Sequence, residues 1–217
     1  MLFRNLMFSL ALTLSYALPA LAADVDPLWT KVIASNKEAK KWAAKDVEQV
    51  IHANKDGDPV KTVTIKKQLS GWDKGKPQYT ILSMNPPAKD GKEKPKAFDL
   101  AEMFEPMEPE FFSPKAKVKR SDNQTYNGKP SVVFEVSESA GTLKIWADPS
   151  NGLIQKRVLE MSMPLAFEGN ITTFYQVDSS GKSLPSESES NIEVKIPFKK
   201  AKVQMKDIYA NWVAQAK

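Results

Sequence analysis

Most of the chain alternates apolar and polar residues in short runs that turn residues separate. Between residues 47 and 212 we count about ten such runs, and turns of the Asp-Gly, Asn-Gly or similar type divide them every 8 to 14 residues. Strict alternation with tight turns is typical of antiparallel hairpins that have one apolar and one wet face. The pattern therefore predicts a mainly β (α+β) protein whose strands follow one another as a meander.

Two helical segments are expected beside the strands. Asp26 is a capping acid and Pro27 suits the first position of a helix, whose apolar stripe continues to about residue 43. The segment 98–114 is rich in phenylalanine and methionine, but its three prolines limit it to a short helical loop. Its apolar content predicts that it is buried.

The balance of sheet and helix constrains the shape. Ten strands at about 4.8 Å spacing form a sheet roughly 45 Å across, which we expect to carry one continuous apolar face. Two helical elements, each about 10 Å wide, would cover less than half of that face. The sheet must therefore curl into a curved, partly closed barrel with a helical plug. Such a shape commonly encloses an apolar cavity.

Two interpretations of this interior remain open: a cavity that binds a hydrophobic ligand, or side chains that meet as a close-packed core. The residues expected to line the cavity are Val63, Ile65, Leu69, Phe104, Met107, Phe111, Phe134, Val136, Ile145, Ile171, Tyr175 and Val194. Arg157 and Lys67 stand on strands beside apolar neighbours. If they point inward, they are candidates to contact a polar head group; otherwise they lie at the rim with their charges in water.

The amino terminus has the pattern of a secretory signal peptide, which we assign to residues 1–22. Arg4 is the only charged residue before Asp24, and an apolar run of about 13 residues follows Arg4. The run is shorter than the roughly 20 residues that span a bilayer. Small residues then suit cleavage after Ala22 or Ala23. The remainder, 23–217, is expected to be one domain without a transmembrane segment.

Cysteine usage and charge indicate the compartment and the partners. The chain has no cysteine, whereas small secreted eukaryotic domains are usually rich in disulfides, so the periplasm of a Gram-negative bacterium is the expected location. The formal net charge of +5 comes from lysines scattered among acidic residues. An ordinary solvated surface is the simplest interpretation, and export makes nucleic acid an unexpected partner.

No residue pattern predicts catalysis, a metal site or a cofactor. The single histidine, His52, lies in a predicted strand and has no cysteine or second histidine to share a metal. Glutamates between 102 and 110 lie on a proline-rich loop, which does not hold catalytic acids at a constant separation. The string 54–58 lacks the remainder of a calcium loop and is interpreted as a hairpin turn. We therefore expect a protein that is not an enzyme.

The C-terminal half resembles outer-membrane lipoprotein-sorting proteins of the LolA-like superfamily. The stretch GTLKIWADPSNGLIQKRV and the later turn GKSLP carry the likeness. The matching residues are Trp146, Asp148, Pro149, Gly152, Leu153, Lys156, Arg157, Gly181, Leu184 and Pro185. The resemblance implies an eleven-stranded half-barrel capped by helices, with a cavity for acyl chains of lipoproteins or other lipids. The aromatic-rich N-terminal pattern and the ligand-gripping arginine of the sorting chaperone are not recognisable here.

These observations together predict a periplasmic carrier or binding protein for a hydrophobic ligand, either a lipid or the acyl chains of a lipidated protein. The alternative is a protein-interaction or sensor module of the same fold, which binds another periplasmic or membrane protein and carries no lipid.

Overall fold

The computed structural model describes residues 25–55, 57–87, 108–139, 141–163, 167–196 and 199–215, and these ranges contain ten strands and two helices. The helices are α1 (Pro27–Ala39) and α3 (Glu108–Phe111). The strands are β1 (Trp42–Lys55), β2 (Lys61–Asp73), β3 (Lys76–Asn85), β4 (Val118–Tyr126), β5 (Lys129–Glu138), β6 (Gly141–Ala147), β7 (Ile154–Met163), β8 (Phe167–Val177), β9 (Ser183–Ile196) and β10 (Lys199–Ala214).

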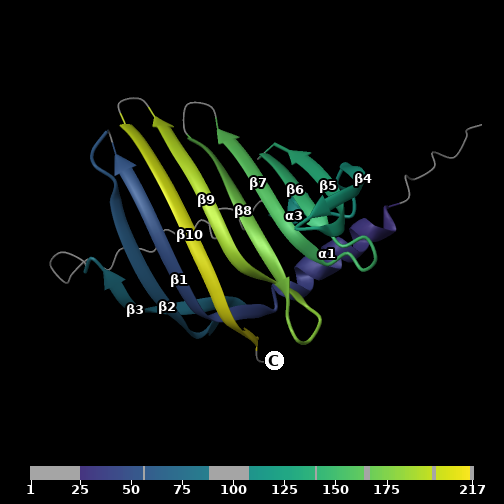
Figure 1. Ribbon diagram of the computed structural model, residues 1–217, viewed down its shortest axis with the longest axis horizontal. Helices are drawn as coiled ribbons and strands as arrows, with labels where there is room; N and C mark the ends of the chain where they lie inside the picture. Colours follow the sequence, from purple (N-terminus) through teal and green to yellow (C-terminus); the bar gives the residue numbers. More distant parts are fainter. Residues whose placement is uncertain are drawn as a thin grey trace, which may run out of the picture.

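All ten strands belong to one antiparallel sheet with the order β3-β2-β1-β10-β9-β8-β7-β6-β5-β4. The sheet is curved and open, with β3 at one end and β4 at the other (Figure 1). Helix α1 lies beside the end formed by β5, β6 and β7, far from β2 and β3 (Figure 1). The predicted mainly β half-barrel with about ten antiparallel strands is therefore confirmed.

The strands form a meander except at one place, where the first strand pairs with the last. Strand β1 runs antiparallel to β10 along almost its whole length, from Trp42 opposite Ala214 to Lys55 opposite Ala201. Each remaining pair joins strands that are consecutive in the chain. The first and last strands of the chain thus lie side by side, as the third and fourth strands counted from the β3 edge.

Helix α1 begins where the sequence predicts and ends earlier. The carboxylate of Asp26 accepts hydrogen bonds from the backbone N–H groups of Leu28 at 2.8 Å and Trp29 at 3.2 Å. The expected end near residue 43 is wrong, because the helix stops at Ala39. Ala43 and Ala44, both buried, instead pair with β10. Their helix propensity is outweighed by the backbone hydrogen bonds and burial that the sheet provides.

The predicted signal peptide, residues 1–22, lies outside the described residues. In the parts of the chain that the structure describes, neither helix has the length and apolar character needed to cross a membrane.

Candidate functional site

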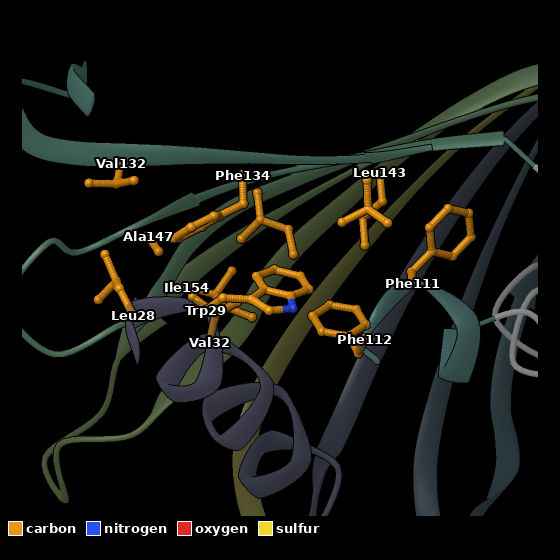
Figure 2. Close-up of a cluster of buried hydrophobic side chains, with 12 residues drawn as sticks. Leu28, Trp29, Val32, Phe111, Phe112, Val132, Phe134, Leu143, Ala147 and Ile154 are labelled. Carbon is orange, nitrogen blue, oxygen red and sulfur yellow. The ribbon is translucent and has the colours of Figure 1, made fainter. Parts of the chain in front are cut away.

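The part of the sheet near α1 is filled by a hydrophobic core. Trp29 packs between Phe112, with ring centroids 6.0 Å apart, and Phe134, with centroids 5.4 Å apart (Figure 2). The twelve buried members of this core come from α1, the α3 region and strands β5 to β7: Leu28, Trp29, Val32, Phe111, Phe112, Val132, Phe134, Val136, Leu143, Ile145, Ala147 and Ile154. We define the face of the sheet that carries Phe134 and Ile145 as the inner face. At this end, the interior is close-packed.

The residues predicted to line a cavity therefore lie in different parts of the sheet. Phe111, Phe134, Val136 and Ile145 belong to the filled core, and Tyr175 packs against it. Ile171 and Val194 lie instead with a second apolar group farther along the same face. Val63, Ile65 and Leu69 follow one another on β2, where Ile65 is 1% exposed. Phe104 and Met107 lie outside the described residues.

The second apolar group, here called the apolar region, is built only from sheet residues. Its buried members are Met161, Ile192 and Met205, and the partly buried residues packed against them are Ile51, Leu159, Phe167, Ile171, Val194 and Val203. No residue of α1 or α3 belongs to it. Ile171 and Leu159 pair across β8 and β7, and Leu159 also touches the filled core. The two apolar parts thus share one face.

A row of polar residues crosses this face, so the expected continuous apolar surface is wrong. Residues directly opposite each other in antiparallel strands point to the same side of the sheet. The row, here called the polar row, runs across β1, β10, β9, β8 and β7 through Gln49, Asp207, Ser188, Thr173 and Arg157. Arg157 lies opposite Ile145, which places the row on the inner face. The next pair on β1 and β10 that points to the inner face is Ile51 opposite Met205, and the apolar region begins there.

Most members of the polar row bond to one another. Gln49 Nε2 donates to Asp207 Oδ1 at 2.9 Å, and Arg157 Nε donates to Thr173 Oγ1 at 3.3 Å. Thr173 and Ser188 place their hydroxyls 3.5 Å apart. Gln49, Thr173 and Ser188 are all buried. Because buried polar groups need partners to offset their lost hydration, this network stabilises the row at the centre of an otherwise apolar face.

Glu108, the first residue of α3, joins the row to both helices. Its Oε2 lies 2.8 Å from Lys40 Nζ, and its Oε1 accepts from Asn36 Nδ2 at 3.0 Å and from Arg157 Nη1 at 3.5 Å. Burial by itself would raise the pKa of this carboxyl group. The two cations and the amide outweigh burial and hold the pKa of Glu108 below its ordinary value of 4.5. Burial also raises the pKa of the nearby Tyr175 phenol, although the charge of Arg157 opposes that change.

We expect this carboxylate to make folding acid-sensitive. Since the folded state lowers the pKa of Glu108, its contribution is complete above the unfolded value of 4.5 and disappears as the pH falls through the folded pKa. Glu108→Gln should lower the free energy of unfolding at pH 7 by about 1–2 kcal/mol, because the ion pairs are only partly buried. Urea unfolding at pH 7 and pH 3 measures this. An equal loss at both pH values would contradict the assignment.

Two polar groups near the β2 end of the row remain without partners among the described residues. Gln49 is 3% exposed, and its Oε1 atom accepts no hydrogen bond. Lys67 is 9% exposed and makes no hydrogen bond or ion pair with another described residue. Lys67 stands opposite Val47, and Ile65 opposite Gln49, so both groups point to the inner face. Arg157 and Lys67, the predicted head-group contacts, thus lie at opposite ends of one polar strip.

Two hollows lie elsewhere on the sheet. The first, about 780 Å³, follows His52, Gln204, Asn191, Asn170 and Glu160, which pair in turn on the face opposite the polar row. Met161, Ile192 and Val203 of the apolar region also contribute to its lining. The second, about 860 Å³, includes Tyr126 and Phe174, whose rings lie 5.9 and 5.8 Å from the Lys156 ammonium. No cluster of three or more potential metal ligands of the His, Cys, Asp or Glu type occurs in the described ranges.

The polar row was missed from the sequence although a signal was present. On β9, Ser188 and Ser190 alternate in step with Ile192 and Val194, so all four point to the same side of the strand. On β1, Gln49 likewise points to the same side as Val47 and Ile51. The alternation therefore placed them on the apolar face. Their alignment across five strands depends on the register of the sheet, and in particular on the pairing of β1 with β10, which a sequence pattern does not contain.

Comparison with known proteins gives structural likenesses only. No protein-family model and no curated protein matches the chain. Similar solved structures include a DUF1329 family protein from Desulfovibrio piger, with 11% identity, 88% of this chain and 93% of that chain covered, and a TM-score of 0.44. A LolA superfamily protein from Nitrosomonas europaea has 10% identity, coverages of 87% and 94%, and a TM-score of 0.37.

A domain described as an outer membrane lipoprotein-sorting protein, from Vibrio parahaemolyticus, has 11% identity, coverages of 86% and 92%, and a TM-score of 0.39. The chain is thus similar to structures that bear the LolA and lipoprotein-sorting descriptions, which are those that its C-terminal motifs resemble.

Proposed function

We propose that the protein is an exported, periplasmic carrier or binding protein for an amphipathic ligand such as a lipid or an acylated protein. The apolar part of the ligand lies on the apolar region of the inner face, and no catalytic step is involved. The pattern of the first 22 residues supports export, and the absence of cysteine supports the periplasm.

One observation carries the proposal: the inner face has an apolar region that neither described helix covers. Met161, Ile192 and Met205 each expose less than a tenth of their surface, yet the residues that pack with them are all strand residues. By contrast, the core beneath α1 is completed by side chains from both helices. Apolar surface gains roughly 25 cal/mol for each Å² removed from water, so the exposed parts of Ile51, Phe167, Ile171, Val194 and Val203, which surround these three residues, favour contact with an apolar partner.

Because the polar row borders the apolar region, the site has a polar end and an apolar end. Along β1, Gln49 belongs to the row, while Ile51 and Ala53 continue toward the β9–β10 end. At about 3.3 Å per residue, a ligand lying along the strands passes from polar to apolar surroundings within roughly 7–13 Å. This order matches a molecule with a polar head and an apolar tail better than a wholly apolar one.

Uptake of a fluorescent fatty acid tests the proposal. Val203→Asn places an amide in the apolar region, and we expect it to weaken binding at least tenfold because the amide must give up water without gaining a partner. Gln204→Asn, the next residue on β10 and on the opposite face, is the control and should bind as the wild type does. Circular dichroism establishes that both variants fold.

Native mass spectrometry of protein purified from a periplasm provides an independent measurement. We expect co-purified lipid in the wild type. A clean apo mass together with no uptake of the fatty acid would rule the carrier function out. A single stoichiometric protein partner without lipid would favour an interaction module instead.

A further inference from the structure

The β2 end of the polar row combines an acceptor and a cation that have no partner in the described part of the chain. Gln49 Oε1 is buried and accepts no hydrogen bond, while Gln49 Nε2 is held by Asp207 at 2.9 Å, which fixes the direction of the amide. Lys67 stands diagonally across the β1–β2 pair from Gln49. Diagonal neighbours of this kind lie about 7 Å apart, which lets one ligand group reach both.

Neither group is expected to remain unsatisfied without a reason. A buried acceptor that lacks a donor costs about 1–3 kcal/mol, and a buried ammonium without an anion costs more. The other charged members of the site are already paired, since Arg157 and Lys40 both contact Glu108. Lys67 is a buried cation of the inner face, and it has no carboxylate partner among the described residues.

The two unmet groups specify complementary ligand chemistry. An ammonium binds an anionic oxygen, and an amide oxygen accepts from a hydroxyl or an N–H group. Resting on the proposed carrier function, we propose that Lys67 and Gln49 bind the head of an anionic amphiphile that carries a hydrogen-bond donor close to its acidic group. The tail of the amphiphile follows β1 and β10 from this point into the apolar region.

A phosphoglycerol head has both features, so short-chain phosphatidylglycerol is the probe. Its binding to the folded full-length mature protein is measured by titration calorimetry below the critical micelle concentration. Phosphatidylcholine with the same tails has a phosphate but no donor, and free glycerol phosphate has the head without the tails. We expect phosphatidylglycerol to bind at least tenfold more tightly than either.

Lys67→Met should reduce this preference over phosphatidylcholine about tenfold, because Lys67 attracts the net negative charge of phosphatidylglycerol more strongly than the zwitterionic head of phosphatidylcholine. Because it replaces a buried charge, which has no counter-ion within the described ranges, by an apolar chain of similar length, it should also raise the melting temperature of the ligand-free protein. Lys67→Arg keeps the charge and should retain the preference. Lys66→Met is the matched control, since Lys66 points to the opposite face near Glu48, 3.8 Å away.

The outcomes separate this inference from the carrier function. If the wild type binds both lipids equally, or if Lys67→Met destabilises the ligand-free protein, the head-group proposal is overturned while the carrier function stands. Tight binding of free glycerol phosphate would overturn the requirement for an amphiphile. Failure to bind any of the lipids would contradict the carrier function itself.

Discussion

Replacing Phe134 by alanine is expected to lower the free energy of unfolding by about 3–5 kcal/mol, which is a large part of the stability of a domain of this size. The Phe134 side chain is completely buried, and its ring lies 5.4 Å from that of Trp29 on α1. Its removal leaves a cavity between the sheet and the helix. The sheet cannot easily collapse into this cavity, because Phe134 is paired with Arg120 on one side and Ile145 on the other. Urea unfolding followed by tryptophan fluorescence measures the loss.

Val177→Ala is the control for this substitution. Val177 is 58% exposed at the end of β8, so the change should stay within about 0.5 kcal/mol. If Phe134→Ala were as mild as Val177→Ala, the filled core beneath α1 would be refuted, and the division of the inner face into a packed end and an uncovered end would fall with it.

The second large effect is expected at Gly152, in the turn between β6 and β7. Gly152 has φ of +75°, and a Cβ atom there would lie 2.5 Å from Lys31 Cβ and 3.1 Å from the Val32 backbone nitrogen. Gly152→Ala therefore combines the cost of a left-handed backbone with a clash against α1. We expect a loss of about 2–5 kcal/mol in the free energy of unfolding.

Gly128→Ala separates these two costs. Gly128 has a similar φ of +73° in the β4–β5 turn, but no atom lies within 4 Å of the position that its Cβ would take. This variant should lose only about 1 kcal/mol, the backbone cost alone. Thermal unfolding of both variants is the measurement. Equal losses would mean that the turn does not press against α1.

The strand pattern could be predicted from sequence because its causes are local. Each hairpin is specified by alternation and by a turn, such as Asn127-Gly128, where both residues have positive φ. The cap of α1 was predictable for the same reason, since Asp26 binds N–H groups two and three residues away. The end of α1 was not, because Ala43 and Ala44 are held by residues of β10 near the other end of the chain.

The candidate site was predictable only in part. Arg157 and Lys67 could be selected because a cation beside apolar neighbours on a strand is unusual, and both do face inward. Their environment could not be predicted. Glu108 reaches Arg157 through the packing of α3, and Asp207 meets Gln49 through the pairing of β1 with β10. Such contacts between distant segments leave no periodic signal in the sequence.

The pairing of β1 with β10 has a consequence for the order in which the molecule assembles. Strand β1 gains a neighbour on its second side only when the final strand has formed, since Trp42 meets Ala214. Contacts of such long sequence separation slow folding, because loop closure must precede the gain in stability. A chain that emerges from its amino terminus thus joins strands β1 to β3 to the rest of its sheet last, and until then β1 has an open edge.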